Sequence, residues 1–203
     1  MKRLALLSAF AFVLAGTACG GSESGETAAA GGEQAAPMEH DMPAAGGETT
    51  AAAPTGALTM PDWYSQNGSN VTLGITAGST NAQNYWNFNG FVGGQGEIVV
   101  PVGSTVTINF SNSDPNMAHS LGIEEWRDSF MGAITPNPVF AGAVSSNPGS
   151  LTDATMPGES ETITFTADQA GRYQMICYIP GHAQIGMWVT FTVSEDGSAG
   201  VRQ

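Results

Sequence analysis

The feature that most constrains the fold is a repeated alternation of apolar and polar residues between residues 58 and 198. In the segment STVTINF, Val106, Ile108 and Phe110 alternate with polar residues, so an extended chain has one apolar face. Similar short segments supply seven more candidate strands: 71–77, 85–89, 97–100, 119–123, 161–167, 171–177 and 187–193. Eight short strands separated by Gly, Pro, Asn and Ser predict an antiparallel β-sandwich.

One stretch does not follow this alternation. Residues 124–131 (EEWRDSFM) favour a helical turn, and the chain from there to residue 160 is broken by proline and glycine. The pattern therefore predicts neither a conformation nor a role for 124–160 as a whole. Residues 58–203 are sufficient to bury one hydrophobic core, so we expect a single domain there.

The N-terminus reads as an export signal rather than as part of the fold. Two basic residues precede an apolar run from Leu4 to Leu14, which is too short to span a bilayer permanently. Because the cleavage region GTAC ends in cysteine, residues 1–18 resemble a bacterial lipoprotein signal, with Cys19 as the lipid-modified first residue. Gly16 stands where such signals usually carry leucine. Ordinary secretion with cleavage near Ala18 is the alternative.

The segment 19–57 consists mainly of Ala, Gly, Glu, Thr and Pro, with almost no large apolar side chain. Such a composition cannot bury enough surface to fold, so it predicts a flexible tether. Within it, Met38, His40 and Met42 carry groups that bind copper weakly, although solvated tether residues are the simpler interpretation. We expect a domain outside the cytoplasm, periplasmic or at the cell surface, that a lipid anchors to a membrane.

Charge and composition exclude some classes of function. The chain has 18 acidic and 5 basic residues and a formal net charge of -13. Nucleic-acid binding needs clusters of Lys and Arg, so we expect no nucleic-acid partner. Three histidines and two cysteines are too few for a multicopper enzyme, whereas one metal centre remains possible.

Potential metal ligands gather around one loop. If Cys19 is lipid-modified, Cys177 has no disulfide partner, which is unusual in an exported protein. In CYIPGHAQIGM, Cys177, His182 and Met187 follow one another at intervals of five residues. Thiolate, imidazole and thioether are ligands of a mononuclear copper electron-transfer site, which also needs a second imidazole. Only His119 can supply it, because it is the one other histidine of the domain.

The predicted strands bring these side chains to one end of the sandwich. Cys177 ends one strand, Met187 begins the next, the loop between them folds His182 back, and His119 opens a further strand. Zinc is a weaker interpretation, because structural zinc prefers several thiolates and catalytic zinc prefers imidazole or carboxylate to thioether. The other alternative is a chance grouping of core residues.

Residues 85–193 resemble a cupredoxin, and most closely a sulfocyanin. The resemblance is carried by NYWNFNG, EIVVPVGSTVTINFSN, NMAHSLGI and ITFTADQAGRYQMICYIPGHAQIGMWVTFTV. It implies a Greek-key β-sandwich with one type 1 copper ion, in which His119, Cys177 and His182 are equatorial ligands and Met187 is the axial ligand. The family usually has an N-terminal membrane helix, where this chain has its lipoprotein-type signal. A binuclear copper centre is excluded, since it needs two cysteines in the loop.

Ser120 directly follows the first histidine and is expected to contact the ligand cysteine. Its backbone N–H and hydroxyl group are placed to donate toward the Cys177 sulfur, which would stabilise thiolate charge and tune the reduction potential. Sulfocyanins and rusticyanins are similar in carrying serine there, whereas many blue copper proteins carry asparagine. A strand serine with local hydrogen bonds is the alternative.

These observations predict a membrane-tethered type 1 copper protein that shuttles single electrons and is not an enzyme. The expected partners are redox proteins such as a cytochrome or a terminal oxidase, with no small-molecule substrate. By resemblance, electrons pass through the solvent edge of His182. The domain has 12 acidic residues against three arginines, which favours a basic partner. A copper-storage or copper-delivery lipoprotein is the alternative function.

Overall fold

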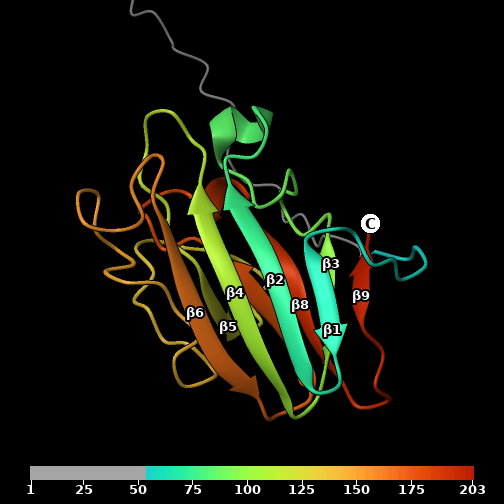
Figure 1. Cartoon of the computed structure of the whole chain (residues 1–203). Helices are drawn as coiled ribbons and strands as arrows, with labels where there is room; N and C mark the ends of the chain where they lie inside the picture. Colours follow the sequence, from blue (N-terminus) through green and yellow to red (C-terminus); the bar gives the residue numbers. More distant parts are fainter. Residues whose placement is uncertain (1–53) are drawn as a thin grey trace, which may run out of the picture. The chain divides into compact units, whose positions relative to one another are not determined.

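The computed structural model describes residues 54–203, which form two β-sheets packed face to face (Figure 1). One sheet has the order β1-β2-β4-β6, with β1 at Tyr64–Asn67, β2 at Asn70–Ala77, β4 at Ser104–Asn112 and β6 at Ser160–Ala167. The other has the order β5-β7-β8-β3-β9, with β5 at Gly122–Glu125, β7 at Gly171–Ile176, β8 at Trp188–Ser194, β3 at Glu97–Pro101 and β9 at Gly200–Arg202.

Several sequence-based predictions lie outside the described residues. These are the signal segment 1–18, the lipidation residue Cys19, and the tether residues Met38, His40 and Met42. They stay predictions. Residues 54–203 contain no helix with the length and hydrophobicity of a membrane span.

The all-β Greek-key sandwich is confirmed, but its strands are not all antiparallel as expected. β2 pairs with β4, and β3 pairs with β8, in parallel. The physical reason is that the chain leaves the first sheet after β2, passes through β3 in the second sheet, and re-enters beside β2 in the same direction. Two short 3₁₀ turns, η1 at Ala82–Tyr85 and η2 at Ala183–Ile185, contact each other at one end of the sheets (Figure 1).

The core follows the predicted alternation. The inward residues of β4 and β8 are buried: Val106, Ile108, Phe110, Val189, Phe191 and Val193. An aromatic group joins the two sheets, because the Phe165 ring on β6 lies 6.1 Å from the Phe191 ring on β8. The Phe140 ring stacks on Phe165 at 5.5 Å. The long insertion between β5 and β6, residues 126–159, therefore contributes to the same core.

The predicted strand at 85–89 was wrong. Its place is taken by a loop in which only Phe88 makes isolated bridges, to Ala77 and Phe91. The reason is that side-chain amides replace the ladder: Asn89 Oδ1 accepts from the Thr76 N–H at 2.6 Å and its Nδ2 donates to a carbonyl of β2. Strands β1 and β9 went unpredicted, because both are short and β1 is mostly polar and exposed.

The insertion that the sequence pattern did not resolve covers the edge of β5. Its backbone bonds to this edge at Val139 and Ser145, which donate to the carbonyls of Ile123 and Leu121. The predicted helical turn at 124–131 was wrong. Glu124 lies within β5 instead, and its carboxylate accepts hydrogen bonds from Tyr178 Oη at 2.7 Å and from the Asn137 N–H at 2.6 Å.

Candidate metal centre

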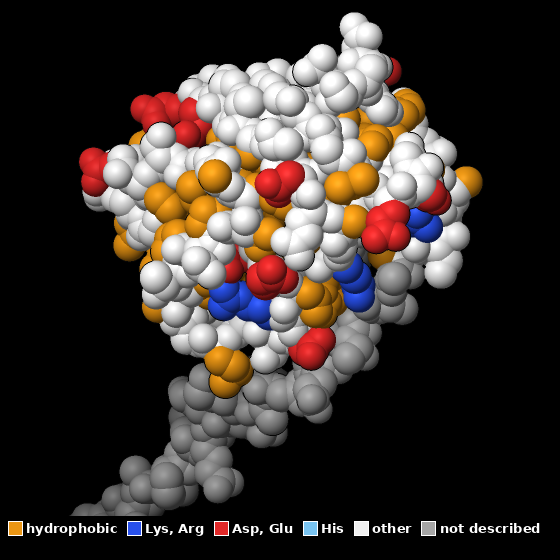
Figure 2. Space-filling view, turned by 90° about the horizontal axis from the view of Figure 1, so that it is seen from below, with side chains coloured by type: hydrophobic (Ala, Val, Ile, Leu, Met, Phe, Trp, Pro, Cys, Tyr) orange, Lys and Arg blue, Asp and Glu red, His pale blue; other side chains and the backbone are white. Residues whose placement is uncertain are grey.

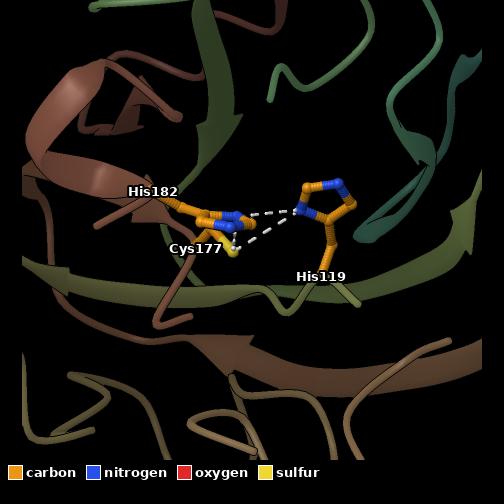
Figure 3. A group of neighbouring side chains, drawn as sticks. All are labelled: His119, Cys177 and His182. Atoms are coloured by element: carbon orange, nitrogen blue, oxygen red, sulfur yellow. Dashed lines mark hydrogen bonds between the residues drawn. The ribbon is translucent and has the colours of Figure 1, made fainter. Parts of the chain in front are cut away.

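Three potential ligand atoms, from His119, Cys177 and His182, lie close together inside one end of the β-sandwich (Figure 3). Cys177 Sγ lies 3.6 Å from His182 Nδ1 and 3.9 Å from His119 Nδ1, and the two Nδ1 atoms are 3.2 Å apart. All three side chains are fully buried. The predicted grouping of one thiol and two imidazoles is therefore present in the structure.

The triangle of donor atoms has the size of a metal site. A point equidistant from the three atoms lies about 2.1 Å from each, close to the ~2.0–2.3 Å bonds that a metal such as zinc makes to imidazole nitrogen and thiolate sulfur. Two imidazoles and a thiol whose donor atoms face one point fit a soft or borderline metal ion better than a packed core, which would not direct lone pairs at one another.

The loop between β7 and β8 carries Cys177, His182 and Met187. Cys177 directly follows β7, and Met187 directly precedes β8. Met187 is fully buried, and its backbone joins the other two residues: its N–H donates to the His182 carbonyl at 2.9 Å, and its carbonyl accepts from the Cys177 N–H at 3.2 Å. Gly186 closes η2 with a φ of 112°, a left-handed conformation that favours glycine, and thereby turns the chain into Met187.

His119 comes from the other side of the site and is held at both its backbone and its ring. It does not open β5 as predicted, since β5 begins at Gly122. His119 instead makes an isolated bridge to Thr155 from the insertion. Its Nε2 lies 2.9 Å from Asp114 Oδ2, and Asp114 is itself buried. Because Nε2–H donates to this carboxylate, the Nδ1 lone pair is left free to face the other ligands.

His182 has a different environment. The indole ring of Trp86 stacks on its imidazole, with 3.7 Å between ring centroids and 19° between planes. His182 Nε2 has no hydrogen-bond partner among the described residues. The expectation that His182 presents an edge to solvent was wrong, because its exposed fraction is 0%.

Ser120 contacts the Cys177 sulfur in the predicted way. Its backbone nitrogen lies 3.4 Å and its hydroxyl oxygen 3.6 Å from Sγ. The same hydroxyl accepts a hydrogen bond from the Tyr178 N–H at 2.9 Å, so its own hydrogen is free to point at the sulfur. Two donors therefore face the position where thiolate charge would lie.

Burial keeps all three groups neutral in the absence of a cation. It raises the pKa of Cys177 to about 11, against hydrogen bonds from Ser120 and the Ile179 N–H, which lower it. Burial, followed by repulsion from His119, lowers the pKa of His182 to about 3. Burial also lowers the pKa of His119, although Asp114 opposes this shift. Neutral imidazoles expose their lone pairs at neutral pH, which is the state that a metal ion requires.

Asp114 and Trp86 contact the ligand histidines, and neither was assigned a role from the sequence. Asp114 lies in the Asp-Pro-Asn turn five residues before His119, and its Oδ1 also accepts from the Asn116 N–H at 2.8 Å. A sequence pattern alone does not reveal that this carboxylate reaches the imidazole. Trp86 lies in the NYWNFNG segment, 96 residues away from its stacking partner in the chain, so no local signal connects the two.

A β-sandwich with a buried cysteine, two histidines and a methionine at one end defines the cupredoxin class, the single-copper electron carriers. The comparison with protein families agrees, because the Sulfocyanin (SoxE) domain matches residues 56–201. The chain therefore belongs to the sulfocyanin family. It is 30% identical to the sulfocyanin of Sulfolobus acidocaldarius over 148 residues, which cover 67% of this chain and 69% of that protein.

Other blue copper proteins are similar over shorter lengths. Rusticyanin of Acidithiobacillus ferrooxidans is 33% identical over 92 residues, which cover 44% of this chain and 54% of that protein. Among solved structures, auracyanin from Roseiflexus castenholzii has 27% identity and a TM-score of 0.42, covering 61% of this chain and 96% of that one. A rusticyanin structure has 22% identity and a TM-score of 0.46, covering 66% and 87%.

Membership of this family sets the cofactor. The chain is a blue copper protein of the cupredoxin class with one type 1 copper ion, and its family consists of electron-transfer carriers. His119, Cys177, His182 and Met187 are positioned as the corresponding site. Zinc, the weaker interpretation of the sequence, has no support in these comparisons.

Proposed function

We propose that this protein is a membrane-tethered type 1 copper carrier that shuttles single electrons between redox proteins outside the cytoplasm. The observation that carries the proposal is the burial of the whole ligand set, since His119, Cys177, His182 and Met187 have an exposed fraction of 0%. A substrate cannot reach a site that is closed in this way, whereas an electron can tunnel to it. The carrier role without enzyme activity follows.

We assign equatorial copper ligation to His119 Nδ1, Cys177 Sγ and His182 Nδ1, and axial ligation to Met187. Bound copper supplies a one-electron couple, because thiolate and thioether suit Cu(I) while imidazole suits Cu(II). Ser120 holds the Cys177 sulfur with two donors, and Asp114 fixes the tautomer of His119. The strands on either side of the loop limit rearrangement of these groups when the electron arrives or leaves.

The setting and the partners of the carrier are part of the same proposal. A lipid on Cys19 anchors the chain to a membrane, and residues 19–57 let the domain reach its partners. The partners are proteins such as a cytochrome or a terminal oxidase. The excess of 12 acidic residues over three arginines in the domain attracts basic partners at long range.

Copper retention distinguishes a carrier from a copper-delivery lipoprotein. Copper-loaded protein should pass through repeated cycles of reduction and oxidation with its metal retained, even when an empty copper-binding acceptor is present. Absorption at each cycle and copper analysis of the separated proteins provide the measurement. Transfer of the metal to the acceptor in the reduced state would favour delivery instead.

The anchor is tested separately. Cys19→Ala should release the protein from the membrane fraction or block its processing, while copper binding by the domain stays intact. Cys177→Ala is the matched control, because it removes the other cysteine and should leave the membrane association unchanged. Wild-type protein that is already soluble after processing would contradict the anchor.

A further inference from the structure

Trp86 separates His182 from the surface of the molecule. His182 is fully buried, and the ring that stacks on it at 3.7 Å belongs to a residue that is itself only partly buried. His182 Nε2 and Trp86 Nε1 are both buried, and neither has a hydrogen-bond partner among the described residues. The two rings therefore meet in a flat contact in which neither ring nitrogen makes a hydrogen bond to the described residues.

The loop that carries Trp86 is held in an unusual conformation. Gln83, Asn84 and Tyr85, directly before the tryptophan, all have left-handed backbone with φ of 48°, 56° and 69°. Three consecutive non-glycine residues in this region cost free energy, and such strain persists only where the surroundings impose it. Here the strain is concentrated at the residues that direct Trp86 onto a metal ligand.

Hydrogen bonds fasten this loop to the ligand loop. Gln83 Nε2 donates to the Ile185 carbonyl at 2.8 Å, and the Gly93 N–H donates to the Gly186 carbonyl at 2.7 Å. The buried amide of Asn87 donates from Nδ2 to two carbonyls within the Trp86 loop, those of Thr80 and Ala82, at 2.9 Å each. The position of Trp86 is thus set before any partner arrives.

Charge is distributed unevenly around this region. No Asp, Glu, Lys or Arg occurs in 79–96, 115–123 or 174–194, the segments that supply Trp86 and the ligands. The acidic residues near the site lie on its His119 side instead: Asp114 contacts His119, and Glu161 accepts from Thr155, which bridges His119. The face seen from below, in Figure 2, carries both acidic and basic groups among apolar ones. Ile185, in the ligand loop and beside Gln83, is 49% exposed and adds an apolar side chain next to the uncharged Trp86 segment.

From these observations we infer that Trp86, rather than His182, is the contact point through which the copper centre exchanges electrons. The partner that docks there is a redox protein with an uncharged, apolar face, and this face packs on Trp86 and Ile185. This inference rests on the proposed electron-carrier function. One electron crosses the stacked rings in each encounter, from the reduced to the oxidised protein, and no bond forms or breaks.

Self-exchange between oxidised and reduced copies of the full protein tests the inference, because a second copy offers an uncharged face of this kind. Trp86→Leu should slow self-exchange by about tenfold, since tryptophan anchors typically carry this much of an encounter's affinity. Trp86→Phe, which preserves an aromatic stack, should restore most of the rate. Trp126→Leu is the matched control, because Trp126 meets Trp188 edge to face and lies under the Arg172 guanidinium instead of on a ligand. An unchanged or faster rate in Trp86→Leu would overturn the inference.

A second pair of variants locates the docking face without changing the site. Ile185→Glu places a charge beside Trp86 and should slow self-exchange at low salt, with recovery as salt screens the repulsion. Val102→Glu, at a position that is 42% exposed in the turn between β3 and β4, should have no such effect. Equal effects of the two variants would place docking elsewhere. In every variant, the absorption spectrum and reduction potential report whether the copper site itself is intact. Absence of a blue site in the wild type would count against the proposed function instead.

Discussion

The two histidines of the copper site are held by opposite kinds of interaction. His119 is fixed through its far nitrogen, by a 2.9 Å hydrogen bond to the buried carboxylate of Asp114. His182 is fixed through its ring face, by the indole of Trp86, and its far nitrogen has no partner among the described residues. A hydrogen bond to a carboxylate orients the His119 imidazole and makes it a stronger donor to a metal. The flat apolar contact with Trp86 instead shields the His182 imidazole from solvent. The site is therefore anchored on one side and closed on the other.

Acid should reveal this difference in the copper-free protein. The pKa of His182 lies at about 3, against 6.5 for a free histidine, so the unfolded chain binds a proton there that the folded chain does not. The free energy of unfolding should fall as the pH drops from about 6.5 toward 3. Urea unfolding at a series of pH values measures it.

Variants separate the contributions of the two histidines. His182→Gln should flatten this pH dependence more than His119→Gln, because Asp114 opposes the lowering of the His119 pKa. If both variants flatten the pH dependence equally, the environments of His119 and His182 do not differ in their effect on protonation. At the other end of the range, stability should fall above about pH 9, since the raised pKa of Cys177 favours the protonated thiol in the folded chain.

Removing the hydrogen bond between Asp114 and His119 should weaken copper binding. Asp114→Ala leaves His119 Nε2 without its acceptor, and loss of such a partner typically lowers metal affinity about 10- to 100-fold. Asp114→Asn keeps an oxygen acceptor, so it should retain copper but raise the reduction potential, because a negative charge near Cu(II) is gone. Competition with a chelator and a redox titration measure the two effects. If Asp114→Ala binds copper as tightly as the wild type, the hydrogen bond does not support the site.

A smaller effect is expected at the axial position. Met187 was expected to begin a strand whose other inward residues are ordinary core, and the structure shows it buried immediately before β8. Axial ligation is long and weak, so Met187→Leu should preserve copper and colour while raising the reduction potential. Met187→Gln should lower the potential, because a harder oxygen donor favours Cu(II). Wild-type potentials in both variants, together with reduced thermal stability, would make Met187 a packing residue.

Period-two alternation was a reliable guide where a strand has one buried face. β4, β6 and β8 were predicted because each buries every second residue against the other sheet. The grouping of Cys177, His182 and Met187 was predictable for a similar reason. Their spacing lies within one loop, and the scarcity of histidine left only His119 as the fourth member.

The remaining features depend on contacts between distant segments. The left-handed turn before Trp86 and the amide bonds of Asn89 replace a strand that the local pattern favours. The buried carboxylate of Glu124 accepts from the Asn137 N–H of the insertion and from Tyr178 in the ligand loop, 54 residues away. Such long-range hydrogen bonds override local propensity, and no periodicity in the sequence signals them.

The central claim is that Cys177 is a copper-bound thiolate between two buried imidazoles. The most direct test is the visible spectrum of the oxidised, copper-loaded protein, compared with that of Cys177→Ser. The account predicts an intense thiolate-to-copper absorption that disappears on reduction and is absent from Cys177→Ser. An unchanged spectrum in Cys177→Ser, or a wild-type protein that binds copper without this absorption, would contradict it.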